Sequence, residues 1–113
     1  MTEKTIFSRI LNGEIKCDEV YNDELCFAFR DIEPQAPTHI LVIPKKTIPS
    51  LKEVENKDSI LLGHLLFIST KIAKAEGLTN WRTIINTGEG AGQTVFHLHI
   101  HILGGREFTW PPG

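Results

Sequence analysis

The sequence predicts an α+β fold, a five-stranded and mainly antiparallel sheet with one long and one short helix. Five alternating or apolar segments bounded by turn residues indicate strands, at 19–21, 25–30, 38–43, 81–87 and 97–103. Two segments with the helical apolar period indicate helices, near 6–11 and over 58–76. A chain of 113 residues suits a single domain spanning 1–113.

The short helix is predicted from apolar residues that share one helical face, Ile6, Phe7, Ile10 and Leu11. Thr5 is placed to cap its N-terminus and Gly13 is placed to end it. Composition alone does not separate a core role for Ile6 and Phe7 from a part in a ligand site.

Segments 19–21 and 25–30 are typical of a hairpin, because turn-forming residues join two apolar runs. Asp31 follows the second run, where a carboxylate is usually a solvated loop residue or a cap. A carboxylate in that place can also accept hydrogen bonds from hydroxyl groups of a ligand. Segment 38–43 is the next predicted strand, and Pro44 closes it.

The long helix has a broad apolar stripe, formed by Ile60, Leu61, Leu65, Ile68 and Ile72 and widened by Leu62, Leu66 and Ala73. Asn56 or Asp58 is placed to begin this helix, and Gly77 is placed to end it. An apolar stripe this broad has to be buried against neighbours on more than one side of the helix. The sheet can supply one side and a second subunit the other.

Three histidines alternate with apolar residues in the last predicted strand. His97, His99 and His101 would share one exposed face of an extended strand. The core-facing set would be Phe96, Leu98, Ile100 and Ile102. The preceding segment, 88–94, is rich in glycine, and its backbone N–H groups could form an anion nest. A histidine stripe beside such a loop suggests a phosphate site.

A surface stripe and a metal site are the alternatives that the spacing leaves open. Imidazole is a common ligand for zinc and other transition metals. Alternate residues of a strand lie roughly 6.5 to 7 Å apart at Cα, so two histidines can converge on one ion but a third reaches it only with difficulty. Cys17 and Cys26 have no paired ligand spacing.

The histidine segment resembles the signature of the histidine triad family of nucleotide hydrolases and transferases, His-φ-His-φ-His-φ-φ with φ apolar. The resemblance extends over nearly the whole chain. It is closest to the histidine triad nucleotide-binding protein branch, whose members are purine nucleoside phosphoramidases. The further matching segments are 29–32, 34–39, 42–46, 92–93, 103–106 and 110–113. The branch implies a homodimer that packs the long helix and extends the sheet across the two-fold axis.

The resemblance also implies a reaction and a role for each histidine. A phosphorus–nitrogen bond of a purine nucleoside monophosphate amide would be cleaved through a nucleotidyl-histidine intermediate, releasing AMP or GMP. His99 would be the nucleophile, with its other ring nitrogen donating to the backbone carbonyl of His97. His101 would bond the phosphate and help to move a proton to the leaving group. His97 and His39 would orient and stabilise the cluster.

The remaining substrate contacts come from the same resemblance. Asp31 would accept hydrogen bonds from the ribose hydroxyls, and Asn86 would donate on the phosphate or ribose side. The nucleobase pocket would be lined by Ile6, Phe7, Phe29 and Ile32. The phosphate would be held by backbone N–H groups and one hydroxyl, from Gly92, Gln93 and Thr94. Relatives often have serine at the position of Thr94, so the added methyl could alter leaving-group selectivity.

We expect neither a cofactor nor a metal. The net charge of −2 argues weakly against a broad nucleic-acid-binding face, and no long apolar run follows the N-terminus to indicate a signal peptide or membrane span. Two cysteines are best explained as reduced thiols of a cytoplasmic protein. The alternatives are a non-enzymatic nucleotide-binding or scaffold protein, a dinucleoside polyphosphate hydrolase and a metal-binding protein.

Overall fold

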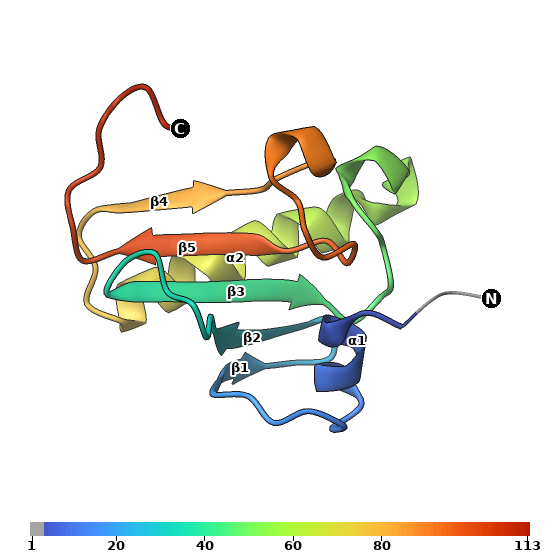
Figure 1. Ribbon diagram of the computed structural model, residues 1–113. Helices are drawn as coiled ribbons and strands as arrows, with labels where there is room; N and C mark the ends of the chain where they lie inside the picture. The colour runs from blue at the N-terminus through green and yellow to red at the C-terminus, as the bar shows by residue number, and fades with distance from the viewer. Residues whose placement is uncertain (1–3) are drawn as a thin grey trace.

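The computed structural model describes residues 4–113, and its centre is one five-stranded sheet in the order β1-β2-β3-β5-β4. Every neighbouring pair of strands is antiparallel. The strands are β1 (Glu19–Asn22), β2 (Cys26–Arg30), β3 (Thr38–Pro44), β4 (Trp81–Ile84) and β5 (Ile100–Gly104). Helix α2 (Ser59–Ala75) crosses behind the sheet and helix α1 (Ile6–Leu11) lies in front of it (Figure 1). The predicted fold class is therefore confirmed.

Two strands are shorter than predicted. β4 ends at Ile84, not at Thr87, and β5 begins at Ile100, not at His97. β4 pairs only with β5, so its ladder stops where that partner begins. The N–H of Leu98 donates to the carbonyl of Ile48, outside the sheet, at 2.7 Å. The first two histidines of the triad therefore lie on the irregular segment that leads into β5.

Helix α1 begins with a reciprocal capping box. The Thr5 hydroxyl accepts from the Ser8 N–H at 3.1 Å, and the Ser8 hydroxyl accepts from the Thr5 N–H at 2.9 Å. The chain leaves the helix at Gly13, whose φ of 79° favours glycine. The predicted cap and stop are both present. They orient the helix so that Phe7 is buried against the sheet.

Helix α2 also begins and ends near the predicted residues. Asp58 occupies the N-cap position, but its carboxylate accepts from Lys46 and from the N–H of Glu55 and does not cap the helix. Gly77, with φ of 80°, follows the last turn. The helix buries Leu65, Ile68, Ser69, Ile72 and Ala73, while Ile60, Leu66 and Phe67 remain exposed. Only part of the predicted apolar stripe is covered in this chain.

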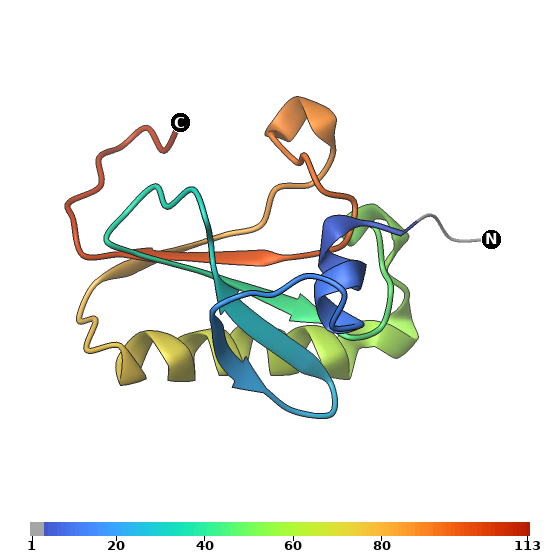
Figure 2. The same cartoon turned by 60° about the horizontal axis from the view of Figure 1, so that its bottom comes forward.

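The sheet has a different core on each face, and Figure 2 shows α2 running along one of them. On the α2 face the strands contribute Cys26, Ala28, Ile40, Val42, Ile100 and Ile102, joined by Leu98. On the other face α1 packs through Phe7 against Phe27, Phe29, Leu41 and Ile43. Phe96 was predicted to join the core and is 45% exposed, because the chain is not yet a strand there. This prediction was wrong, whereas Leu98, Ile100 and Ile102 are buried as predicted.

Within residues 4–113, none of the helices has the length and apolar character needed to span a bilayer.

Candidate active site

The three triad histidines lie on the α1 face of the sheet, and they are buried instead of forming an exposed stripe. His97 is fully buried, His99 is 6% exposed and His101 is half-buried. The ring of Phe7 packs edge to face against two of them, with its centroid 4.9 Å from that of His99 and 6.2 Å from that of His97. The period-two alternation was predicted correctly, but the exposure of the histidine face was not.

The ring of His99 is fixed in one tautomer. Its Nδ1 lies 2.7 Å from the backbone carbonyl of His97, and a carbonyl oxygen can only accept. Nδ1 therefore carries the proton and Nε2 has a free lone pair. The contact predicted for the central histidine is present.

A second chain of contacts fixes the tautomers of His39 and His101. The N–H of Gln35 donates to Nδ1 of His39 at 3.0 Å, so a neutral His39 carries its proton on Nε2. That Nε2 lies 2.9 Å from Nδ1 of His101. His101 accepts there, and its own proton is therefore on Nε2. His39 therefore lies beside His101 and contacts its ring.

Two buried ring nitrogens of the cluster have no hydrogen-bond partner among the described residues, Nδ1 of His97 and Nε2 of His101. The other nitrogen of His97, Nε2, donates to the carbonyl of Pro44 at 2.8 Å, which leaves Nδ1 as an acceptor. The Nε2–H of His101 is a hydrogen-bond donor that has no acceptor among the described residues. A buried donor without a partner is costly, and a bound anion would remove that cost.

Burial keeps the histidines neutral. It lowers the pKa of His97, His99 and His39, although the carbonyl contacts of the first two and Asp31 beside the third oppose the effect. The pKa of His101 falls to about 4, because burial is reinforced by His99 and His39 beside it. A neutral imidazole is the form that has a nucleophilic lone pair.

A cavity of about 540 Å³ opens beside the histidines and holds most of the predicted site residues. Those that line it are Ile6, Phe7, Phe29, Asp31, Ile32, His39, Gly92, Thr94, His99 and His101. Asn86, Gln93 and His97 do not line it. The cavity wall also contains residues that the sequence did not indicate, Ile10, Ile15, Cys17, Leu41 and Val95. Ile15 and Cys17 lie in an irregular segment with no period, so no sequence signal would have identified them.

Asp31 lies at the mouth of this cavity. One carboxylate oxygen, Oδ1, accepts from the N–H of Glu33 at 2.9 Å, and Oδ2 lies 3.4 Å from Nε2 of His39. Ile32 beside it is 88% exposed and forms the rim. The Asp31 carboxylate is fixed by these contacts and lies beside an apolar rim. Such a site can bind a ligand that has vicinal hydroxyls and a flat apolar part.

The glycine-rich loop differs from the predicted anion nest. It folds into a 3₁₀ turn (Glu89–Ala91), and the N–H groups of Gly92 and Gln93 donate to the carbonyls of Glu89 and Gly88 at 3.0 and 3.1 Å. These two N–H groups, predicted to hold phosphate, are already engaged. The physical reason is that closing the turn consumes them, and Thr94 is left as the loop residue after the turn that faces the cavity.

Gln93 supports this loop from behind. The side chain is 2% exposed; Oε1 accepts from the N–H of Gly88, and Nε2 donates to the carbonyls of Pro49 and Val95 at 2.8 and 3.0 Å. Asn86 lies on the same side, since a Cβ on Gly92 would come 3.8 Å from its Nδ2. In this structure both residues contact the loop and neither lines the cavity.

The carboxylate and two histidines of the cavity could also hold a metal. One ligand atom each of Asp31, His39 and His101 lies within 4.8 Å of the others. An ion there would replace the hydrogen bond between the two imidazoles. It would therefore compete with the tautomer that gives His101 its Nε2–H.

The buried triad, its fixed tautomers and the adjoining cavity agree with a comparison of the whole sequence. The HIT domain model matches residues 12–108. The chain belongs to the HIT, or histidine triad, family.

Individual relatives of this HIT protein match over nearly their full length. An uncharacterized HIT-like protein of Synechococcus elongatus is 59% identical over 114 residues, covering all of both chains. The 14 kDa zinc-binding protein of Zea mays is 48% identical over 112 residues, covering 96% of this chain and 88% of that protein. A HIT family hydrolase from Legionella pneumophila has a TM-score of 0.95 at 48% identity, covering 97% of this chain and 100% of that structure.

A histidine triad protein from Clostridium difficile has a TM-score of 0.90 at 43% identity, covering 96% of this chain and 97% of that structure. This HIT protein therefore has the fold of HIT family hydrolases, and its family is the predicted one.

Proposed function

We propose that this HIT protein is a purine nucleoside phosphoramidate hydrolase. The observation that carries the proposal is the neutral His99 ring, with Nδ1 bonded to the His97 carbonyl 2.7 Å away and Nε2 left free at a cavity. A lone pair of this kind attacks phosphorus without a separate base. The product would be AMP or GMP together with an amine.

Two ring nitrogens of the cluster take part in the reaction, the lone pair on Nε2 of His99 and the N–H on Nε2 of His101. Nε2 of His99 attacks the α-phosphorus, and the electrons of the P–N bond leave with the amine nitrogen. The amine nitrogen takes up a proton from solvent as it leaves, and the Nε2–H of His101, buried and without a protein partner, donates a hydrogen bond to it. Water then attacks the nucleotidyl-histidine, restores the neutral His99 and releases one proton to solvent, so one water is consumed for each P–N bond broken.

The cavity walls favour a nucleoside over a simple phosphate. Phe7 and Phe29 are packed edge to face at 5.5 Å between ring centroids, beside the apolar side chains of Ile6 and Ile32. A purine ring would lie against this wall by burying apolar surface. Asp31 is then within the cavity for the ribose hydroxyls, and Thr94 for a phosphate oxygen.

The test is steady-state hydrolysis of a panel of adenosine and guanosine phosphoramidates by the wild-type chain and by His99→Ala. We expect the variant to bind AMP within a few-fold of wild type and to lose turnover, since only the attacking atom is removed. AMP binding by calorimetry is the control for folding and for the cavity. Undiminished hydrolysis by His99→Ala would reject the assigned nucleophile.

Two alternative functions are separated when a diadenosine polyphosphate is added to this panel. A diadenosine polyphosphate hydrolysed faster than every phosphoramidate would assign the chain to the polyphosphate hydrolases. Nucleotide binding without turnover of any member would favour a binding or scaffold role. The grouping of Asp31, His39 and His101 favours metal binding as a third function, and loss of phosphoramidate hydrolysis on chelation would support that one.

A further inference from the structure

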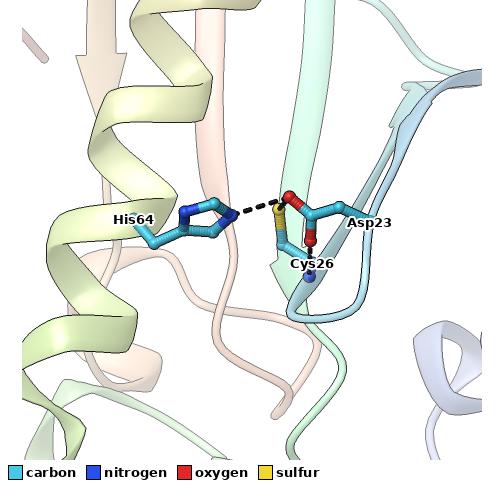
Figure 3. A group of neighbouring side chains, drawn as sticks. All are labelled: Asp23, Cys26 and His64. Carbon is cyan, nitrogen blue, oxygen red and sulfur yellow. Dashed lines mark hydrogen bonds and ion pairs between the residues drawn. The ribbon is translucent and has the colours of Figure 1, made fainter.

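A second cluster of polar side chains lies on the α2 face of the sheet, away from the cavity. It consists of Asp23 in the β1–β2 turn, Cys26 at the start of β2 and His64 on α2, which point toward one another in Figure 3. The turn and the helix are far apart in the sequence, since Asp23 and His64 are separated by 41 positions along the chain. The cluster therefore exists only in the folded chain.

The ligand atoms of the cluster converge on one carboxylate oxygen. Oδ2 of Asp23 accepts from Nε2 of His64 at 2.7 Å, from the hydroxyl of Tyr21 at 2.8 Å and from Sγ of Cys26 at 3.6 Å. The other oxygen, Oδ1, accepts from the N–H groups of Leu25 and Cys26 at 2.7 and 2.8 Å. These backbone bonds hold the carboxylate in its orientation, so the arrangement is already formed.

The charges of the cluster suit a divalent cation. Burial opposes ionisation of Asp23, but the hydrogen bonds from His64, Cys26, Leu25 and Tyr21 outweigh it and lower the pKa of the carboxyl. Cys26 is fully buried, and burial, reinforced by Asp23, raises the pKa of its thiol to about 12. A buried thiol beside a carboxylate has only a weak hydrogen bond to offer, whereas as a thiolate it is a strong metal ligand.

We propose that Asp23, Cys26 and His64 form a zinc site. One sulfur, one imidazole nitrogen and one carboxylate oxygen, each within 4.8 Å of the others, make a donor set that zinc accepts in tetrahedral coordination. The Tyr21 hydroxyl or a water would complete the four ligands. Side chains of Asp23 and His64 are 23% and 28% exposed, so the ion enters from their side.

Binding at this site exchanges protons for the ion without any redox change. Cys26 releases its thiol proton and binds as thiolate, and His64 binds through Nε2 as a neutral imidazole with its proton on Nδ1. The ion with two anionic ligands leaves no net charge at the site. Zinc would tie the β1–β2 hairpin to α2, a structural role that is independent of the phosphoramidase proposal.

Cobalt(II) titration of the chelator-treated full-length protein tests the site, because only a thiolate ligand gives a sulfur-to-cobalt charge-transfer band in the near ultraviolet. We expect the band in wild type, its displacement by zinc, and release of about one proton per ion. Cys17→Ser, which removes the other free thiol, should retain the band, and so should His101→Ala. Cys26→Ser should abolish it, and His64→Gln should weaken cobalt binding at least about tenfold.

A second measurement, the effect of zinc on Tm, distinguishes loss of the zinc site from misfolding of Cys26→Ser. Zinc stabilises the folded state only where it binds, so it should raise the Tm of wild type and Cys17→Ser but not that of His64→Gln, whose substitution is at a partly exposed helix position. A chelated wild type without a charge-transfer band, or a band that persists in Cys26→Ser, would overturn the zinc site. Equal zinc-dependent Tm shifts in wild type and His64→Gln would also overturn it.

Discussion

At the scale of single residues, the proposed reaction depends on where three ring protons are placed. The sequence identified the histidines and the alternation that puts them on one face. It did not indicate that they are buried, because a period of two is the same for an exposed and a covered face. Burial by Phe7 and α1 is a tertiary effect, and it is what lowers the pKa of these histidines.

The rate of phosphoramidate hydrolysis should not depend on pH near neutrality. The lowered pKa values mean that His99 stays neutral below about 6.5, the ordinary value for histidine. We expect kcat/KM for a phosphoramidate to stay level as the pH falls through 6.5 and to decline only at lower pH. A pH–rate profile with a substrate that does not titrate in this range is the measurement. An acid limb centred at or above 6.5 would contradict the neutral buried triad.

The same shifts predict an acid-sensitive fold. Below about 6.5 the unfolded chain takes up protons on histidines that the folded chain keeps neutral, so the unfolded state binds more protons there. The free energy of unfolding should therefore fall as the pH decreases from 6.5 toward 4. Urea unfolding at a series of pH values measures this, and a stability that rises over that interval would contradict it.

At the scale of elements, the short helix, the long helix and the existence of five strands were predictable from caps, glycines and periods. Thr5 and Gly13 set the ends of α1 because their roles are local. The ends of β4 and β5 were not predictable, since a strand ends where its partner ends and pairing is not local. The loop at 88–94 was misjudged for a similar reason, because its N–H groups close a turn within the loop.

Removal of the Gln93 side chain should destabilise the loop at 88–94. Gln93→Ala leaves the Gly88 N–H and the Pro49 and Val95 carbonyls without their partner, and we expect a loss of at least about 2 kcal/mol in unfolding free energy. Phosphoramidase activity should fall with it, as Thr94 loses its position. Urea unfolding is the measurement, with the exposed Gln35→Ala as matched control. Equal stability of the two variants would argue against this role.

At the scale of the whole molecule, part of the apolar surface of α2 is not buried within a single chain. An apolar groove of about 220 Å³ is lined by Leu51, Leu62, Leu65, Leu66, Ile85, Leu98 and Ile100. It lies between α2 and the segment that follows β4, and β4 is an edge strand of the sheet. Exposed apolar surface next to an unpaired edge is typical of an interface, which agrees with the homodimer expected from the sequence.

The homodimer is tested by charge substitution in this groove. Leu66 is 49% exposed, so Leu66→Glu should fold while placing a carboxylate in the interface and shifting the chain to monomer. Lys71→Glu also introduces a carboxylate, beside Val20 on the opposite side of the helix, and should leave the dimer intact. Sedimentation equilibrium distinguishes the two. A monomeric wild type, or equal dimerisation of both variants, would contradict the prediction.

In the proposed reaction, a neutral Nε2 of His99 attacks phosphorus in the cavity. The most direct measurement is rapid acid-free quenching during turnover of an adenosine phosphoramidate, followed by mass spectrometry of the digested protein. We predict an adenylyl group on the peptide that contains His99, localised to that ring and lost on longer incubation. Turnover with the adduct on His97 or His101, or with no adduct at any time, would contradict the assignment of His99 as the nucleophile.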